Sequence, residues 1–247
     1  MPYARKGAGM TATAQRLMLE LYGRDIWRDV AETVPAREPD LQGWNGNHPV
    51  FRRLLAEGTR PAVLVDVGVW KGQSTITMAR ALRDNALDGC VIAVDTFLGS
   101  PEHWFEEGAL YRRAAGRPDL YERFLGNILG EGLQDYVVPL PQTSAAAAAI
   151  LEGAGVAATL VHIDASHAYE DVLRDAAAYW KLVEVGGCLV GDDYDPSWPG
   201  VIRAASEFSR AVGRPIEIAY PKWILRKTGR DGPSPRPAEP AGLPPIF

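Results

Sequence analysis

The chain has 247 residues, of which 47% are hydrophobic and 23% charged, and its net charge is −5, as in ordinary globular proteins. Acidic and basic residues are interspersed, which argues against broad nucleic-acid binding, and no apolar run approaches the ~18 residues of a membrane span. Both cysteines, Cys90 and Cys188, lie in apolar runs, so we expect buried thiols rather than a disulfide. No signal-peptide pattern follows the basic first residues, and we therefore expect a cytoplasmic protein.

The first 60 residues carry helical patterns that are separated by a loop. Residues 10–33 show one apolar stripe, 34–48 are rich in Pro, Gly and Asn, and VFRRLL from residue 50 predicts a short helix. We interpret residues 1–60 as an N-terminal helical segment that forms a lid or a dimer contact.

From residue 61 short apolar runs alternate with helical segments, a pattern typical of a parallel sheet covered on both faces. The expected strands are 62–68, 90–96, 136–141, 159–164, 186–193, 216–220 and 223–227. The expected helices are about 74–82, 144–153, 168–180 and 199–208. The last two strands are separated only by Pro221-Lys222 and predict a hairpin. The predicted fold is α/β: a doubly wound, Rossmann-like, seven-stranded, mostly parallel sheet with a reversed last strand at its edge, plus N-terminal helices.

Three further boundaries follow from the pattern. The core is expected to span 61–227, and within it the polar and aromatic stretch 97–134 reads as an insertion on the substrate side. The proline-rich segment 228–247 has no periodicity and reads as a C-terminal arm. The N-terminal helices and this arm look like additions that form a lid or a homodimer or larger homo-oligomer.

Ligands of doubly wound sheets bind outside the carboxyl ends of the strands. Six residues are expected along that edge: Asp66, Gly68, Asp95, Asp164, Asp192 and Asp193. The first motif there is VDVGVWKGQST, in which Gly68 permits a tight turn, Gly72 permits close approach to a ligand, and the helix that begins near Ser74 has open N–H groups. The alternative is an ordinary strand-to-helix turn, and the motif is not the GxGxxG of dinucleotide-binding proteins.

In the second motif, AVDTF, Asp95 ends a strand more than 20 residues beyond the glycine loop, where a carboxylate can accept hydrogen bonds from a ribose diol. The alternative role for Asp95 is a helix cap.

Acidic residues then gather in HIDASHAYED and GDDYD. Asp164, Asp192 and Asp193 would repel one another at close range, and a hard divalent cation such as Mg²⁺ would remove that conflict. The alternative is that Asp164 caps a helix, Asp192 caps a turn and Asp193 is solvated.

His167 follows Asp164 by three residues and is expected at the start of a helix, from which it could take a proton from a hydroxyl group. The alternative is that His167 has a structural role at the start of the helix, where it bonds to a carboxylate. His162, inside a strand, reads as a satisfied core residue. Among the loop histidines, His103 is the better candidate for a substrate contact than His48.

With these residues in place, the chain resembles the class I S-adenosylmethionine-dependent methyltransferases over about residues 44–227. It is most similar to the metal-dependent small-molecule O-methyltransferases that tailor macrolide and deoxysugar natural products, as in antibiotic biosynthesis. VDVGVWKGQST resembles the first methyltransferase motif, AVDTFLGSPEHW resembles the second, and HIDASHAYEDV with GGCLVGDDY resembles the metal-dependent substrate edge.

The resemblance implies a role for each motif residue. Contacts with S-adenosylmethionine are implied for Asp66, Gly68, Trp70, Gly72, Ser74, Asp95, Thr96, Thr143, Ser144 and Asp164. Mg²⁺ ligands are implied at Asp164, Asp192 and Asp193. The base is implied to be His167, with Asp164 as its competitor. The aromatic residues of 97–134, together with Tyr194 and Trp198, would form the acceptor wall, and His103, Trp104, Tyr194 and Trp198 would touch the substrate.

The expected activity is therefore methyl transfer to a hydroxyl of a small sugar or phenolic molecule, without nucleic-acid or membrane partners. Three alternatives stay open. The first is a metal-independent O- or N-methyltransferase that uses His167 as base. The second is a nucleotide-binding oxidoreductase, although its motifs are not evident. The third is a non-catalytic cofactor-binding scaffold. The aromatic stretch could also pack against a second subunit.

Overall fold

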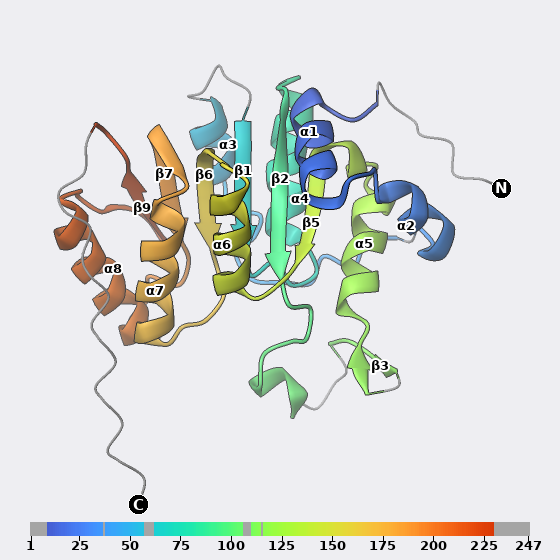
Figure 1. Cartoon of the computed structure of the whole chain (residues 1–247). Coiled ribbons are helices and arrows are strands. Elements are labelled where there is room, and N and C mark those ends of the chain that lie inside the picture. Colours follow the sequence, from blue (N-terminus) through green and yellow to red (C-terminus); the bar gives the residue numbers. More distant parts are fainter. Residues whose placement is uncertain (1–8, 37, 57–61, 106–109, 115, 230–247) are drawn as a thin grey trace, which may run out of the picture.

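The computed structural model describes residues 9–36, 38–56, 62–105, 110–114 and 116–229, so almost all of the predicted C-terminal arm lies outside the described residues. The described chain forms one large sheet with helices on both faces, and a small separate ribbon (Figure 1). The large sheet contains β1 (Ala62–Val67), β2 (Gly89–Asp95), β5 (Val137–Pro141), β6 (Ala158–Ile163), β7 (Val183–Gly191), β8 (Glu217–Ala219) and β9 (Lys222–Arg226). The ribbon contains β3 (Arg113–Ala114) and β4 (Arg117–Pro118).

The α-helices are α1 (Ala12–Tyr22), α2 (Trp27–Thr33), α3 (Val50–Ala56), α4 (Gln73–Asp84), α5 (Leu120–Gly130), α6 (Ser144–Gly153), α7 (Tyr169–Trp180) and α8 (Pro199–Val212). Two short 3₁₀ helices, η1 (Glu102–Trp104) and η2 (Gln134–Tyr136), complete the described elements. The helices predicted from the sequence after residue 61 all appear, but α5 was not predicted.

The strand order of the large sheet is β5-β2-β1-β6-β7-β9-β8. The first five strands in this order are parallel to one another, and β9 is antiparallel to both β7 and β8. The predicted α/β fold with seven strands and a reversed last strand is confirmed. The predicted position of that strand is wrong, because β9 lies inside the sheet and β8 forms the edge. The hairpin turns back toward β7, so its second strand is the one that pairs with the parallel strands.

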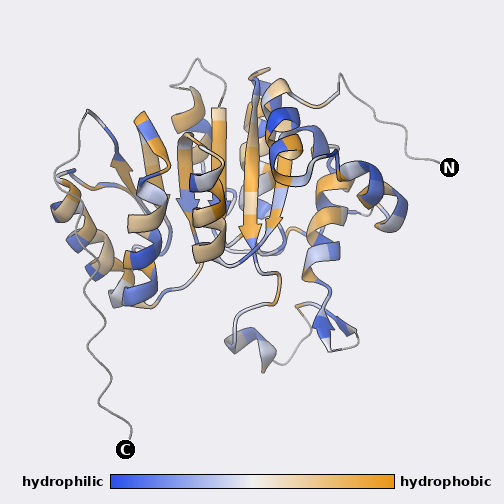
Figure 2. Ribbon diagram, in the orientation of Figure 1, coloured by the Kyte–Doolittle hydropathy of each residue, from blue (hydrophilic) through white to orange (hydrophobic). Residues whose placement is uncertain are grey.

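The central strands are covered on both faces, which explains their continuous apolar sequences. Every residue of β1 is buried, and so is most of β2. Helices α6 and α7 cover one face of the sheet, and α3 and α4 cover the other (Figure 1). Coloured by hydropathy, the central strands are mainly hydrophobic and the helices are mixed, with hydrophilic stretches along them (Figure 2). The core therefore lies in two layers, one on each side of the sheet.

The N-terminal helices belong to this same core. Thr11 caps α1, and Gly23 in the left-handed conformation ends it, which divides the predicted helical stretch into two helices. The Trp27 indole donates a hydrogen bond of 2.8 Å to the Val137 carbonyl. Residues 12–33 are thus docked on β2 and β5. The loop that follows residue 33 is the part of the N-terminal segment that lies over the strand ends.

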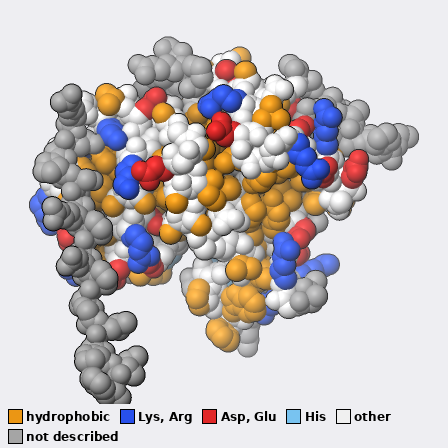
Figure 3. Space-filling model, viewed as in Figure 1, with side chains coloured by type: hydrophobic (Ala, Val, Ile, Leu, Met, Phe, Trp, Pro, Cys, Tyr) orange, Lys and Arg blue, Asp and Glu red, His pale blue; other side chains and the backbone are white. Residues whose placement is uncertain are grey.

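The stretch 97–134 divides into two parts. Phe124 on α5 is fully buried and packs against Phe97 with the two rings tilted by 41°, and Tyr111 is also buried. These two side chains, predicted as part of an acceptor wall, are instead core residues. The remaining part, which includes η1 and the β3-β4 ribbon, projects beyond the strand ends (Figure 1), and hydrophobic side chains gather on that projection (Figure 3). Phe105 is 88% exposed there.

Among the described residues, no helix combines the length and the apolar character that a membrane crossing requires. Cys90 and Cys188 are both buried thiols, as the sequence led us to expect.

Candidate active site

The carboxyl ends of β1, β2, β6 and β7 bring the predicted acidic residues to one edge. In the strand register Asp66 pairs with His162, Asp95 pairs with Pro141, and Gly191, the residue before Asp192, pairs with Ile163. The register therefore places the predicted residues on the edge of the sheet where ligands of this fold class bind.

Gly68 is the point where the loops after β1 and β6 cross. Its φ of +84° is in the left-handed region, and an added Cβ would lie 1.8 Å from the backbone oxygen of Asp164. Only glycine satisfies both conditions. The absent side chain lets Asp164 lie directly against the glycine loop, so the acidic edge and the proposed cofactor loop form one structure.

Gly72 was predicted to permit close approach of a ligand, but the structure gives another reason for a glycine at this position. An added Cβ would lie 2.9 Å from the ring of Phe124, so the empty space accommodates an aromatic side chain of α5. The N-terminus of α4 is likewise less open than predicted, because Gly46 lies against it: a Cβ on Gly46 would be 2.7 Å from the Ser74 nitrogen. Loop 40–46 thus covers the start of α4.

An ion-pair cluster fastens this covering loop. The Asp40 carboxylate pairs with buried Lys71 and with Arg123, at 2.9 Å in both cases. Although partial burial opposes it, these two cations keep the pKa of Asp40 below its ordinary value. The Asn127 amide adds hydrogen bonds to the carbonyls of Asp40 and Lys71. None of these contacts was predicted, because Asp40, Arg123 and Asn127 lie far from the motifs in sequence.

Asp66 is fully buried, and protein groups engage both of its carboxylate oxygens. Ser74 Oγ and Thr75 Oγ1 donate to one oxygen at 2.8 and 2.6 Å, and His162 Nδ1 lies 2.7 Å from the other. These contacts fix the first turn of α4 relative to β1 and β6. Direct cofactor contacts by Asp66 and Ser74 remain predictions, and the observed contacts are structural.

Asp95 lies at the end of β2 with its carboxylate partly open. The backbone N–H groups of Trp70 and Phe97 donate to its two oxygens at 2.9 and 2.7 Å. Burial raises the pKa of Asp95 in spite of these hydrogen bonds. Each carboxylate oxygen retains a second lone pair, so the group can still accept hydrogen bonds from a diol. The glycine loop adjoins it, since Gly68 N donates to Val94 O.

Thr143 occupies the start of α6 on the same edge. Its hydroxyl accepts a hydrogen bond from Ala146 N and caps the helix, and the carbonyl of Ser144 accepts one from Tyr179. Thr96 is exposed beside Asp95. Adenine contacts by Thr143 and Ser144 therefore remain predictions with a structural alternative.

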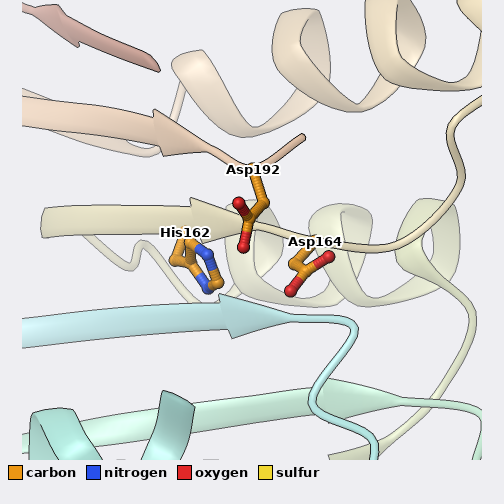
Figure 4. A group of neighbouring side chains, drawn as sticks. All are labelled: His162, Asp164 and Asp192. Atoms are coloured by element: carbon orange, nitrogen blue, oxygen red, sulfur yellow. The ribbon is translucent and has the colours of Figure 1, made fainter. Parts of the chain in front are cut away.

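His162 is fully buried, as the sequence indicated, and it is part of a longer polar chain. Its Nε2 lies 3.2 Å from Nζ of Lys222, which forms a hydrogen-bonded ion pair with Asp192. Lys222, the first residue of β9, is also fully buried. Its sequence position predicted a turn residue, so its place in the site was not predicted. The side chains of His162, Asp164 and Asp192 lie close together at the ends of neighbouring strands (Figure 4).

His167 and Asp193 form a second pair nearer the surface. His167 Nε2 lies 2.7 Å from Asp193 Oδ2, and the two side chains are 28% and 21% exposed. The Trp198 ring stacks on the imidazole at a centroid distance of 4.1 Å. A small pocket in this region is lined by Asp164, His167, Asp193, Trp223 and their neighbours. The structure therefore brings the predicted base, one predicted metal ligand and one predicted substrate residue together.

The other predicted substrate residues lie elsewhere or make different contacts. His103 stacks on Trp44 with an interplanar angle of 6° and also contacts Trp70. Trp104 lies under the guanidinium of Arg113. Tyr194 is partly buried and donates its backbone N–H to Pro221. Trp44, which is 54% exposed, is an aromatic member of this cluster that the sequence reading missed.

The three acids predicted to hold Mg²⁺ do not form a single ligand set. Among the described residues, two trios place one ligand atom each within 4.8 Å of one another: His162, Asp164 and Asp192, and Asp164, His167 and Asp193. In the first trio the ammonium of Lys222 already contacts both His162 and Asp192. The charge of that ammonium opposes the binding of a divalent ion at Asp192. The second trio is chemically suited to an ion, because it offers two carboxylates and an imidazole.

Asp164 should leave a signature in the pH dependence of stability. Burial, and then the neighbouring carboxylate of Asp192, raise the pKa of Asp164 well above its ordinary value. The folded protein therefore binds this proton more tightly than the unfolded chain does. Stability from the protonated group is present below the ordinary pKa and is lost as the pH rises through the raised value.

Asp164→Asn cannot ionise, so with EDTA present we expect it to melt at a higher temperature than the wild type at about pH 8. At about pH 4 we expect no such gain. Scanning calorimetry at the two pH values measures this, with exposed Asp84→Asn as the control. A loss of stability that is equal at both pH values would contradict the assignment.

Comparison with known proteins identifies the family. A family model described as a methyltransferase domain matches residues 65–194, which is more than half of the chain and includes every strand-end acid described above. The chain belongs to this methyltransferase family. The enzyme is an S-adenosylmethionine-dependent methyltransferase with the class I fold, as the sequence resemblance implied.

Solved structures share the fold of this methyltransferase. The O-methyltransferase NovP is 23% identical, with a TM-score of 0.58 over 74% of this chain and 80% of NovP. An O-methyltransferase from Bacillus cereus, in complex with S-adenosylhomocysteine, is 16% identical, with a TM-score of 0.52 over 87% and 98%. The S-adenosylhomocysteine-bound methyltransferase PaMTH1 of Podospora anserina is 13% identical, with a TM-score of 0.52 over 82% and 86%.

Proposed function

We propose that this methyltransferase transfers a methyl group from S-adenosylmethionine to a hydroxyl oxygen of a small molecule, with the His167–Asp193 pair as its base. The observation that carries the proposal is the 2.7 Å contact between His167 and Asp193 on the ligand edge. The O-methyltransferases NovP and that of Bacillus cereus share the fold, which is in keeping with oxygen as the acceptor atom.

The residues suited to hold the cofactor surround the Gly68 loop. Asp95 would accept hydrogen bonds from the ribose, and the tight crossing at Gly68 would leave the backbone of the loop next to the methionine part. When bound, the cofactor supplies an electrophilic methyl group on a cationic sulfur. The acidic residues of this edge favour a cation there, although Lys222 balances the charge of Asp192.

His167 would take the proton from the acceptor hydroxyl as the oxygen–methyl bond forms and the carbon–sulfur bond breaks. Asp193 would orient the imidazole and stabilise the imidazolium that results, as a carboxylate does for other catalytic histidines. Trp198 limits the rotation of the ring by stacking on it. Much of the rate acceleration would come from alignment of the acceptor, for which Trp198 and Tyr194 offer aromatic surface.

Dependence on Mg²⁺ is a separate prediction, and among the described residues the Asp164, His167 and Asp193 trio suits such an ion best. An ion there would be held by the two carboxylates and would lower the pKa of the acceptor hydroxyl. The metal-independent alternative needs only the His167–Asp193 pair. Formation of a homodimer or larger oligomer also remains a prediction.

The test uses methyl-labelled S-adenosylmethionine and a panel of sugar, phenolic and amine acceptors, with products identified by mass spectrometry and NMR. We expect labelled methyl ethers, and we expect His167→Gln to lower kcat about 10²- to 10⁴-fold while S-adenosylhomocysteine binding is kept. Exposed Glu152→Gln is the matched control. Labelled N-methyl products alone, or an unchanged kcat in His167→Gln, would contradict the proposal. Repeating the assay with EDTA tests the metal prediction separately.

A further inference from the structure

Lys222 is a fully buried cation at the ligand edge, and the proposed reaction gives it no role. It lies at the start of β9, which runs antiparallel to β7, so its first residue adjoins the carboxyl ends of β6 and β7. Phe51 of α3 closes the site from another side, with the ammonium 5.2 Å from the ring centroid. A buried charge of this kind is costly unless it is paired.

Two acceptors satisfy the ammonium. One is Asp192, whose carboxylate forms an ion pair with it, and the other is His162 Nε2 at 3.2 Å. The proton positions on His162 follow from its neighbours. Nδ1 faces the Asp66 carboxylate and therefore carries the hydrogen, which leaves Nε2 as an acceptor for Lys222. The nitrogen lone pair that a metal would need is already used.

The carboxylate of Asp192 is occupied in a similar way. One of its oxygens accepts from Lys222, and the other accepts from the backbone N–H of Asp193 at 2.9 Å. The ligand atoms of His162, Asp164 and Asp192 nevertheless lie within 4.8 Å of one another, the spacing of a metal site. The three donor residues of a metal site are thus present. The ammonium group of Lys222 already contacts two of them, His162 and Asp192.

We propose that Lys222 is the resident cation of this site, and that it takes the place of a divalent metal between His162 and Asp192. Asp192 is then a partner of Lys222 and does not ligate a metal. Any divalent ion that the enzyme binds at this edge is held by the carboxylates of Asp164 and Asp193. Lys222 is a positioning residue: it holds Asp192 and, through His162 and Asp66, connects to the start of α4.

Co²⁺ is a suitable probe because it binds mixed imidazole and carboxylate ligands more tightly than Mn²⁺, and its visible absorption reports its coordination. Four proteins are titrated with Co²⁺ by calorimetry and absorption: the wild type, Lys222→Met, Asp192→Asn and the double variant Lys222→Met/Asp192→Asn. Lys227→Met, a lysine beyond the other end of β9 that donates to the Trp180 carbonyl, is the matched control. Thermal unfolding and S-adenosylhomocysteine binding establish that each variant is folded.

We expect the wild type and the double variant to bind Co²⁺ with the same affinity, because neither has a metal ligand at Asp192. We expect Lys222→Met to bind Co²⁺ at least about tenfold more tightly than both, since the repulsion by the ammonium is gone and two carboxylates and an imidazole are exposed to the ion. A new absorption band should accompany that gain. Lys227→Met should behave as the wild type does.

Two results would overturn the proposal. The first is a wild-type Co²⁺ affinity that falls at least about tenfold in the double variant, which would make Asp192 a metal ligand despite Lys222. The second is a folded Lys222→Met protein without a gain in affinity. If Lys222→Met does not fold, the comparison of the wild type with the double variant still tests the proposal. The double variant removes both charges of the pair and so leaves neither of them buried and unpaired. None of these titrations needs an acceptor, so they are independent of the proposed methyl transfer.

Discussion

Gly68→Ala is expected to lower the free energy of unfolding by more than about 4 kcal/mol and to abolish binding of S-adenosylhomocysteine. The added Cβ would lie 1.8 Å from the backbone oxygen of Asp164, and neither of the two backbones can move without displacing β1 or β6. The residue would also retain a φ of +84°, which L-residues with a side chain rarely adopt. Urea denaturation measures the first effect and calorimetric titration the second.

Gly155→Ala separates the clash from the cost of the backbone conformation. Gly155 also has a positive φ, +64°, but nothing lies within 4 Å of its added Cβ. We expect this variant to lose only about 1–2 kcal/mol of stability and to bind the ligand normally. Equal losses in the two variants would show that the crossing of the two loops is not the constraint at Gly68.

Asp95→Ala is expected to weaken binding of S-adenosylhomocysteine about 100-fold or more. A carboxylate that accepts two hydrogen bonds from a ribose diol contributes about 1.5–3 kcal/mol for each of them. Some loss of stability should accompany the substitution, because the N–H groups of Trp70 and Phe97 lose their acceptor. Calorimetric titration well below the melting temperature separates the two effects.

The ribose contact can be isolated with the 2′-deoxy analogue of the ligand. In the wild type the analogue should bind more weakly than S-adenosylhomocysteine, and in Asp95→Ala the two should bind equally. Asp84→Ala, which removes an exposed carboxylate paired with Arg83, is the control and should leave both affinities unchanged. An analogue penalty that persists in Asp95→Ala would place the ribose elsewhere.

The sequence was sufficient to predict the order of the elements and the edge that carries the site. Both follow from local patterns. Apolar β-branched runs predict the strands, and an acid that follows such a run lies at the carboxyl edge of the sheet however the helices pack. It could not predict α5 as a core helix. The aromatic residues of that stretch, such as Phe124, resemble an exposed wall in sequence, whereas in the structure Phe124 is buried in the space left by Gly72.

Two parts of the site depend on pairings between distant segments. Asp40 is anchored by Lys71 and Arg123, which no local pattern connects to it. The position of Lys222 could have been predicted from the topology of the sheet. A reversed last strand must begin at the edge where the parallel strands end, so its first residue had to lie beside the acids. The sequence assigned Lys222 to the turn of the hairpin and not to the first position of the strand, so its position beside the acids was not predicted.

The position of β9 inside the sheet also affects how the site is assembled during synthesis. Strands β1, β2, β5, β6 and β7 all leave the ribosome before Lys222 does, and chains of this size begin to fold from the N-terminus as they emerge. Until the β8-β9 hairpin docks and β9 pairs with β7, Asp192 and Asp164 lie close together without Lys222 beside them. A nascent chain that ends before Lys222 would therefore have most of the sheet and an uncompensated acidic edge. Completion of the last hairpin is the step that neutralises it.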